Sequence, residues 1–372
     1  MPADARHLKI GDPAPDFSLQ GVDGKTYTLA DFKDAPILMV AFLSNHCPYS
    51  HAAETRLLPL YAEMKAKGMA LVAIDPDAPE GVGISELGYS KYTDSYDDMK
   101  LYARERGFTF PYIYDGVTQR TAKAYGAICT PHIFIFDRDR KLRYMGRLDD
   151  SPYAQTNTVT SQDARNAVVA MLAGQPVPVA VTRPFGCSVK WLENKPALAK
   201  ANAKWESTPA IIGPIDSAGV AALVKNDTNQ LRLINVWATW CVPCVEEFPD
   251  LVTLIRQFQT RNFELVTISM DRPEDRAKAL EFLQKQHAAL PERVRRVIGN
   301  EGRSTDNYLF SGTPAELQQT LDSDWPGPVP YTLIVAPGGK ILYRHMGAID
   351  LAEVRAQLVG QLGPYYNPTT NN

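Results

Sequence analysis

The same local pattern occurs twice in this chain: a short apolar segment runs into a cysteine, and a helical pattern follows. Residues 36–43 read PILMVAFL before Cys47, and residues 231–237 read LRLINVW before Cys241. Short apolar runs rich in β-branched residues are typical of buried strands. After each cysteine, apolar residues recur at helical spacing. The chain thus contains two copies of a buried strand that leads directly into a helix. This repeat restricts the number of folds that the chain can adopt.

Both halves continue in the same order after this helix. A second strand pattern follows at residues 69–75 and at residues 263–271. Strands that alternate with helices in this way indicate a core of parallel strands. Each half then has a proline, a strand, a turn, a second strand and a final amphipathic helix, with the hairpins over 129–149 and 329–350 and the helices at about 161–173 and 350–362. We therefore expect an α/β protein of two similar domains, each a central mixed β-sheet flanked by helices.

The length of the chain also favours two domains. A chain of 372 residues is long for a single hydrophobic core. Residues 173–209 contain several prolines and two basic stretches, which indicate the tail of one domain and a linker. We expect the first domain to span residues 6–204 and the second domain to span residues 205–364.

Composition excludes some classes of partner. The net charge of −3 gives no electrostatic reason to expect nucleic acid or an anionic membrane as a partner. No apolar run reaches the roughly 18 residues that a membrane-spanning helix needs. Five cysteines do not make a disulfide scaffold in a chain of this length. The first residues lack the basic and apolar regions of a signal peptide, so we expect a cytoplasmic protein, or an exported one whose leader was removed.

The second strand–cysteine–helix pattern carries two cysteines, Cys241 and Cys244, in the sequence WCVPC. The N-terminus of a helix presents free N–H groups and a partial positive charge, and both favour a thiolate. Cys241 is therefore expected to be the nucleophile, and Cys244 the thiol that resolves a mixed disulfide. A zinc site is the alternative for a lone CxxC, but no second CxxC and no pair of suitably spaced histidines accompanies it.

The segment WATWCVPCVEEFP resembles the active-site segment of the thioredoxin superfamily. Within that superfamily it resembles the TlpA/ResA-like thiol–disulfide oxidoreductases, whose motif is WCxPCxxExP. The resemblance implies thioredoxin-like domains and an enzyme that exchanges disulfides with disulfide-bearing protein substrates. It also implies an upstream thiol reductant and no cofactor. Relatives of this kind are commonly exported bacterial proteins, which favours a periplasmic or cell-envelope location.

Glu247 falls on the glutamate of this motif. The resemblance implies that Glu247 acts as a proton acceptor near Cys244. A carboxylate on the helix surface or in the first turn of the helix is an equally good interpretation. Thioredoxins proper carry a buried aspartate six residues before the first cysteine. This chain has Asn235 at that place, so a proton route through an aspartate is not available there.

Pro330, in the segment PVPYT, matches the cis-proline that faces the CxxC in this superfamily. A cis peptide bond at this place would hold backbone groups beside Cys241, where they could pair with an extended substrate. We expect Trp240 and Tyr331, the sequence neighbours of Cys241 and Pro330, to take part in substrate binding together with Pro330.

The first half resembles the AhpC/TSA-type, peroxiredoxin-like proteins over nearly its whole length. The matching segments are IGDPAPDFSL, NHCPYS, AYGAICTPHIFIFD, LRYMGRLDDS and FGCSVKW. Many relatives have a CxxC where this chain has Ser44 and Cys47, so no disulfide can form within the motif. Peroxiredoxins place a serine or threonine three residues before the peroxidatic cysteine, and Ser44 has that spacing from Cys47.

Three roles remain open for Cys47. It could be a peroxidatic cysteine that reduces hydrogen peroxide or an organic hydroperoxide and is then reduced by the second domain. It could belong to a non-catalytic domain that binds a partner. It could also be a copper ligand together with His46 and His51, since two histidines and a thiolate suit copper. The peroxidatic role needs an arginine that polarises the peroxide, and the candidates are Arg56, Arg143 and Arg147.

Two further cysteines could resolve an oxidised Cys47. Cys129 lies two residues before Pro131, the first-half equivalent of the cis-proline, and Cys187 lies in the tail segment FGCSVKW. Free cysteines are often simply buried in the core. The sequence leaves this interpretation open for both.

Overall fold

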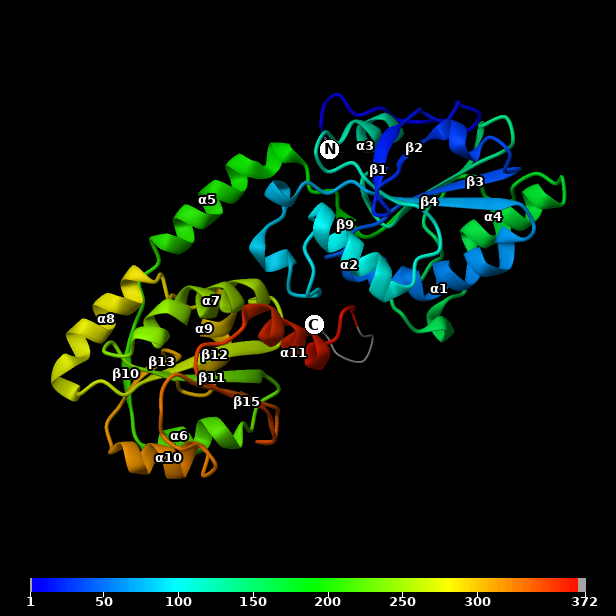
Figure 1. Cartoon of the computed structure of the whole chain (residues 1–372). Helices are drawn as coiled ribbons and strands as arrows, with labels where there is room; N and C mark the ends of the chain where they lie inside the picture. The colour runs from blue at the N-terminus through cyan, green and yellow to red at the C-terminus, as the bar shows by residue number, and fades with distance from the viewer. Residues whose placement is uncertain (1, 367–372) are drawn as a thin grey trace. The chain divides into compact units, whose positions relative to one another are not determined.

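The computed structural model describes residues 2–366, and they form two compact units, each built on its own β-sheet (Figure 1). The first unit contains the residues up to Leu198 and the described residues after Leu362, and the second unit contains the residues between. The boundary falls before the predicted position at residue 205. Helix α5 (Lys195–Glu206) runs across it, and a continuous helix leaves no loop to mark a boundary in the sequence.

The first unit is built on a seven-stranded mixed sheet with the strand order β2-β1-β5-β4-β3-β7-β8. Strands β3, β4 and β5 run parallel, and β7 and β8 extend the sheet as antiparallel strands. The mixed sheet predicted from the alternation of strands and helices is thus confirmed. The strands are β1 (Ser18–Gly21), β2 (Thr26–Thr28), β3 (Ile37–Phe42), β4 (Met69–Asp75), β5 (Tyr112–Tyr114), β7 (His132–Phe136) and β8 (Leu142–Gly146).

Apolar side chains alternate between the two faces of this sheet, as expected for strands that are buried on both sides. In β3, Met39 and Ala41 face one core, and Leu38 and Val40 face the other. Helix α1 begins directly after β3, at the end of the sheet where open α/β folds place their sites. One face is covered by α1 (Pro48–Lys65), α2 (Tyr96–Arg106) and α4 (Asp163–Leu172), and the other by α3 (Arg120–Tyr125).

The second unit repeats this plan on a six-stranded sheet with the order β10-β13-β12-β11-β14-β15. The strands are β10 (Gly213–Ile215), β11 (Leu231–Trp237), β12 (Phe263–Ser269), β13 (Asn307–Phe310), β14 (Tyr331–Val335) and β15 (Ile341–Met346). The first four in this order run parallel, and β14 and β15 are antiparallel. One face is covered by α7 (Val242–Phe258), α8 (Arg276–Lys285) and α11 (Leu351–Leu362), the other by α6 (Ser217–Lys225) and α10 (Pro314–Leu321), while α9 (Glu292–Gly299) precedes β13.

A cis-proline precedes the closing hairpin in each unit. The peptide bonds Thr130–Pro131, before β7, and Val329–Pro330, before β14, are both cis. In the first unit, the residues before the proline form strand β6 (Cys129–Thr130), which pairs antiparallel with β9 (Cys187–Ser188). Strand β9 lies within residues 173–209, which were predicted to be a tail and a linker. Part of this segment is therefore hydrogen-bonded to the proline loop of the first unit.

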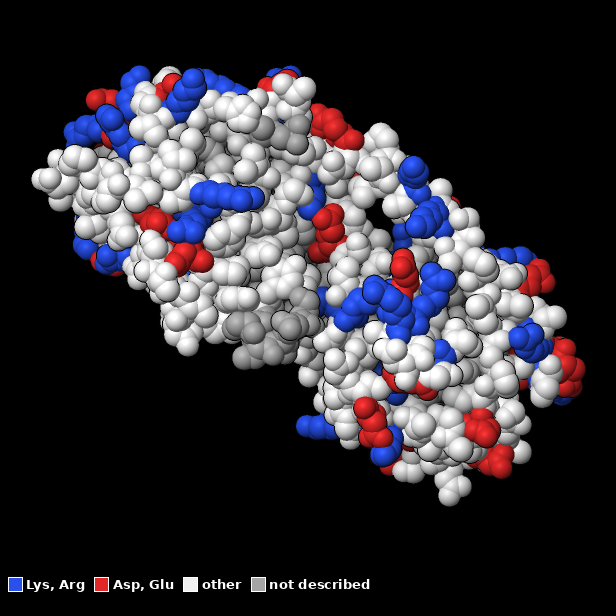
Figure 2. All heavy atoms as spheres, turned by 180° about the vertical axis from the view of Figure 1, so that it is seen from behind, with Lys and Arg blue, Asp and Glu red and all other residues white. Residues whose placement is uncertain are grey.

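Charged side chains of both signs are interspersed over the face that Figure 2 shows. This distribution agrees with the small net charge of the chain, −3. Within residues 2–366, no helix combines the length and the apolar character that crossing a membrane requires.

A buried group of charges joins neighbouring strands of the second unit. Arg232 on β11 and Glu264 on β12 are direct partners in the parallel ladder and form a buried ion pair. Arg303 adds a second contact to Glu264 at 2.7 Å and binds Asp306 at 2.6 Å. A buried charge that loses its partner destabilises a protein strongly.

We expect Glu264→Ala to destabilise the second unit by about 3–5 kcal/mol, because Arg232 would stay buried without its main carboxylate partner. Urea unfolding followed by tryptophan fluorescence measures this loss. The signal comes mainly from the second unit, which holds four of the five tryptophans of the chain, Trp205, Trp237, Trp240 and Trp325.

Glu281→Ala is the control for this experiment. It removes an ion pair with Lys285 in which both side chains are exposed, and such pairs contribute little. The unfolding midpoint should stay in place. Equal shifts for the two variants would show that burial of the Arg232–Glu264 pair does not matter.

Candidate active sites

Cys241 and Cys244 form a disulfide at the start of helix α7, with an S–S distance of 2.02 Å. Cys241 is the N-cap residue, and its sulfur accepts a hydrogen bond from the N–H of Cys244 at 3.3 Å. Cys244 is completely buried, whereas Cys241 keeps 6% of its surface exposed. Cys241 is thus the sulfur that an incoming thiol or disulfide meets first, which is the order that exchange through a CxxC requires.

Two large apolar side chains beside Cys241 face solvent. Trp240 is 61% exposed and Val242 is 66% exposed. Large apolar side chains that adjoin a reactive group offer a contact surface to a partner, and tryptophan is the side chain most enriched at such contacts. Trp240 is thus exposed next to Cys241, and its role in substrate binding stays a prediction.

The structure corrects the role predicted for the side chain of Tyr331. This side chain lies on the inward face of β14 and is only 3% exposed. Its hydroxyl donates to Asp322 at 2.7 Å, and its ring stacks on Trp325. The carbonyl of Pro330 is also engaged, because it accepts from the N–H of Gly347 at 2.9 Å. Tyr331 therefore supports the proline loop from within and does not offer its side chain to a substrate.

Glu247 lies one turn after Cys244 on α7, and it is buried. One carboxyl oxygen accepts from the side-chain amide of Asn235 at 2.8 Å, and the other accepts from the N–H of Ile349 at 2.8 Å. Burial raises the pKa of Glu247 above its ordinary value of 4.5. The interpretation of Glu247 as an exposed helix carboxylate is therefore wrong. A buried carboxyl with a raised pKa is suited to proton transfer.

In the first unit, Cys47 occupies the position that corresponds to Cys241. It is the N-cap residue of α1 and is completely buried. When it is protonated, its thiol donates to the carbonyl of Thr130 at 3.0 Å, and its sulfur accepts from the N–H of Ser50 at 3.4 Å. Thr130 is the direct partner of Cys187 in the β6–β9 pair, so Cys187 lies beside the same residue that Cys47 contacts.

The two cysteines that could resolve Cys47 are therefore not equivalent. Cys129 precedes Thr130 on β6, and successive side chains of a strand point to opposite sides. The thiol of Cys129 donates to the carbonyl of Pro131 at 3.5 Å, and burial raises its pKa to about 12. Cys187 is therefore the cysteine opposite Thr130, the residue that Cys47 contacts, while the thiol of Cys129 bonds to Pro131.

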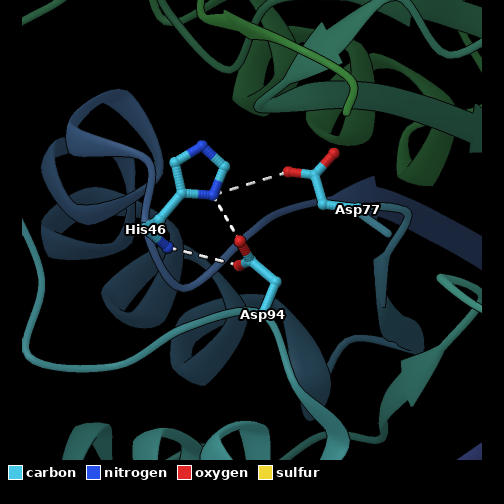
Figure 3. Close-up of side chains that lie close together, drawn as sticks. All are labelled: His46, Asp77 and Asp94. Atoms are coloured by element: carbon cyan, nitrogen blue, oxygen red, sulfur yellow. Dashed lines mark hydrogen bonds and ion pairs between the residues drawn. The ribbon is translucent and has the colours of Figure 1, made fainter. Parts of the chain in front are cut away.

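His46 lies in a buried cluster with two carboxylates, Asp77 and Asp94 (Figure 3). Its Nδ1 hydrogen-bonds to Asp94 and lies 3.7 Å from Asp77. Burial disfavours the charged imidazole, but the two carboxylates outweigh it and raise the pKa of His46 to about 9. His46 therefore carries a positive charge at neutral pH, directly next to Cys47 in the chain.

This cluster was missed in the sequence analysis. Asp77 comes from the loop after β4 and Asp94 from the loop before α2, and nothing in their spacing connects them to His46. The position of Asp77 just beyond a buried strand, in the segment IDPD, was the available signal.

The pKa of Cys47 reflects these neighbours. Burial by itself would raise it, but the hydrogen bond from Cys187 and the charge of His46 outweigh burial and lower the pKa to about 5. The pKa of Cys187 moves the other way, well above its ordinary value, chiefly because its thiol hydrogen-bonds to Cys47. Cys47 therefore loses its proton at a lower pH than Cys187 does.

Ser44 and the three candidate arginines were predicted to assist peroxide chemistry. Each of them has a hydrogen-bond or ion-pair partner other than Cys47. The hydroxyl of Ser44 hydrogen-bonds to the hydroxyl of Thr130 at 3.0 Å. Each of the three candidate arginines forms an ion pair away from Cys47, in the pairs Arg56–Asp149, Arg143–Asp137 and Arg147–Asp163. The guanidinium groups of all three are thus already paired with a carboxylate.

The copper site predicted as an alternative is not supported, because of His51. Both of its ring nitrogens lie at hydrogen-bond distance from backbone carbonyls, Nε2 at 2.7 Å from Asn45 and Nδ1 at 2.8 Å from Pro364. Neither nitrogen is open to a metal ion. The Nδ1 of His46 is likewise engaged with Asp94.

Each unit is a thioredoxin-like domain: a central strand leads into a helix capped by a cysteine, and a cis-proline precedes the antiparallel hairpin. The AhpC/TSA family matches residues 10–145 and residues 220–344, one stretch in each unit. The chain belongs to the AhpC/TSA family.

Relatives named for thiol–disulfide chemistry match part of the chain. The thiol-disulfide oxidoreductase ResA of Oceanobacillus iheyensis is 31% identical over 135 residues, which cover 36% of this chain and 58% of that protein. The thiol:disulfide interchange protein DsbE of Pseudomonas aeruginosa is 28% identical over 126 residues, which cover 34% of this chain and 56% of that protein. The chain thus spans less than two thirds of the length of either relative.

A solved structure is similar to half of the chain. The hypothetical protein SMc02350 of Sinorhizobium meliloti 1021 is 35% identical and covers 50% of this chain and 97% of its own, with a TM-score of 0.45.

We expect the thiolate of Cys47 to persist well below neutral pH. In a reduced chain that carries Cys241→Ser and Cys244→Ser, the ultraviolet absorbance of the thiolate should titrate with a midpoint near pH 5. Because the pKa in the folded state is lowered, the associated stabilisation is complete above the ordinary thiol pKa and is lost as the pH falls through about 5.

Two histidine variants test the cause of this shift. His46→Gln removes a positive charge and should raise the midpoint of Cys47 by at least about one pH unit. His51→Gln is the matched control, because burial lowers the pKa of His51 to about 4 and the residue is neutral when Cys47 titrates. The same midpoint in both variants would show that the charge of His46 does not stabilise the thiolate.

Proposed function

We propose that this protein is a thiol–disulfide oxidoreductase that exchanges disulfides with protein substrates through Cys241 and Cys244. The observation that carries the proposal is the CxxC disulfide at a helix N-terminus, with the more accessible sulfur at the N-cap. The names of the ResA and DsbE relatives support the same type of reaction.

The exchange proceeds through a mixed disulfide. In the reducing direction, the thiolate of Cys241 attacks one sulfur of the substrate disulfide, and the other substrate sulfur leaves as a thiolate. The thiolate of Cys244 then attacks the sulfur of Cys241, which forms the Cys241–Cys244 disulfide and releases the second substrate thiolate. An upstream thiol reductant restores the two thiols. The N–H groups at the start of α7 stabilise the Cys241 thiolate during this cycle.

The surroundings of Cys241 favour a protein substrate. Trp240 and Val242 provide an exposed apolar surface on one side of the sulfur. The cis-proline loop at Val329–Pro330 precedes β14, which pairs with the strand leading to Cys241. An extended polypeptide with apolar side chains next to its cysteine would bury Trp240 as it binds.

Glu247 is proposed as the proton acceptor for the thiol of Cys244. It is the buried carboxyl one turn along the same helix, and Asn235 and Ile349 fix its orientation. Its raised pKa means that it exchanges protons closer to neutral pH than an exposed glutamate does.

The resemblance to exported oxidoreductases supports a periplasmic or cell-envelope location, with an upstream thiol reductant in the same compartment. Fractionation of cells that produce the protein distinguishes this location from the cytoplasm.

Cys244→Ser should trap a mixed disulfide between Cys241 and a disulfide-bonded peptide, because no second thiol is present to resolve it. Non-reducing electrophoresis and peptide mass mapping detect the adduct. Cys241→Ser should form no adduct and should lose exchange activity. Cys129→Ser, a buried thiol of the other unit, is the control and should exchange at the original rate. An adduct of equal yield in Cys241→Ser would refute the assigned roles.

Glu247→Gln should slow resolution of the mixed disulfide by roughly 10- to 100-fold, because the Cys244 thiol loses its proton acceptor. Stopped-flow release of a labelled peptide measures this step. The rate for the original chain should fall as the pH drops through the raised pKa of Glu247, and Glu247→Gln should lack this dependence.

Glu246→Gln changes the neighbouring, exposed carboxylate and is the matched control. It should keep both the rate and the pH profile of the original chain. Parallel pH profiles for Glu247→Gln and Glu246→Gln would exclude Glu247 as the proton acceptor.

A further inference from the structure

We propose that Cys47 and Cys187 form a second dithiol–disulfide couple, which oxidises substrate thiols and works independently of the CxxC. The function proposed above uses only Cys241 and Cys244, so this couple is an additional redox centre in the first unit. No CxxC spacing marks it, because its two cysteines come from segments that are far apart in the sequence.

The first support is that both cysteines meet the same residue, Thr130. The sulfur of Cys47 lies 3.0 Å from the carbonyl oxygen of Thr130, and Cys187 is the direct strand partner of Thr130. The residue before Cys187 allows this close approach. A Cβ atom at Gly186 would lie 2.1 Å from the carbonyl oxygen of Thr130, so only glycine lets β9 come this near to the proline loop.

The second support is the difference in exposure between the two sulfur-bearing residues. Cys47 is completely buried, and Cys187 is partly exposed. In a Cys47–Cys187 disulfide, an incoming thiolate would therefore reach the sulfur of Cys187 first. Attack there makes Cys47 the leaving group.

The charges around the pair favour this direction. Exchange is faster when the leaving thiol has a low pKa, and a couple whose reduced form is stabilised is the stronger oxidant. The departing Cys47 thiolate would be stabilised by the positive charge of His46 and by the N–H of Ser50. The other charged groups near the pair are Lys190, Asp77 and Glu54, of which Lys190 favours and the carboxylates oppose a negative charge.

The reaction balances as follows. One thiolate of a substrate dithiol attacks the sulfur of Cys187, which forms a mixed disulfide and releases Cys47 as a thiolate. The second substrate thiolate attacks the substrate sulfur in the mixed disulfide, which forms the substrate disulfide and releases Cys187. Two electrons pass from the substrate to the couple. Of the two protons that the substrate dithiol loses, Cys187 takes up one and solvent takes up the other. A disulfide compound such as glutathione disulfide reoxidises the couple by the reverse exchange.

The test uses the full chain with Cys241→Ser and Cys244→Ser, which leaves the first unit unaltered and removes the CxxC. The reduced protein is equilibrated with glutathione and glutathione disulfide, quenched with acid, alkylated and mapped by mass spectrometry. We expect one disulfide, between Cys47 and Cys187, while Cys129 is alkylated as a free thiol. The oxidised protein should then convert one equivalent of a peptide dithiol to its disulfide.

Variants test how the charge acts. His46→Gln should shift the equilibrium with glutathione toward the Cys47–Cys187 disulfide by about 10- to 100-fold, because the competing thiolate is less stabilised. His51→Gln and Cys129→Ser should leave this equilibrium unchanged. These changes in an equilibrium constant are not expected from a loss of packing alone.

Three results would overturn the proposal. Cys47 could pair with Cys129, or Cys47 and Cys187 could stay reduced at every glutathione ratio. The third is a Cys47–Cys187 disulfide that does not oxidise the peptide dithiol. Because the chain under test lacks the CxxC, none of these results bears on the function proposed for Cys241 and Cys244.

Discussion

Both candidate sites depend on the antiparallel pairing between the central strand of a sheet and the strand that follows the cis-proline. In the first unit, β3 pairs with β7, and Cys47 thereby reaches the carbonyl of Thr130, 83 residues further along the chain. In the second unit, β11 pairs with β14 in the same way. Helices α1 and α7 begin just after the central strands. Their N-terminal N–H groups therefore lie at the cysteine of their own unit, next to its proline loop. The sheet thus assembles a helix N-terminus, a cysteine and a proline loop in each unit.

The two units differ in where the second thiol comes from. In the second unit it is Cys244, one turn along the helix, and the local geometry of the helix sets its distance from Cys241. In the first unit Ser44 takes the place of a partner cysteine, and its hydroxyl bonds to Thr130. A short strand from the domain tail brings Cys187 to the same proline loop instead. One scaffold can therefore hold a local pair of thiols or a pair from distant segments.

The units also use different buried polar groups beside their thiols. The first unit places the cation His46 next to Cys47 and holds it with two carboxylates, which favours a thiolate. The second unit places the carboxyl of Glu247 near Cys244, with Asn235 as its hydrogen-bond donor. A cation stabilises a charge that is already present, whereas a carboxyl with a raised pKa exchanges protons. The two arrangements therefore suit different steps of thiol chemistry.

The sequence by itself determined the features that depend on local spacing. Strand patterns, the helix that starts at each cysteine, the closing hairpins and the CxxC could all be predicted, because neighbours along a strand or helix have fixed geometric relations. Tertiary structure alone decided the rest. Strand register placed Cys187 opposite Thr130, beside Cys47, and set Cys129 at the neighbouring strand position. Packing of loops joined Asp77 and Asp94 to His46, and packing in the core buried the side chain of Tyr331. Contacts between distant segments are set by strand pairing and by packing in the core, and no spacing rule in a single sequence encodes them.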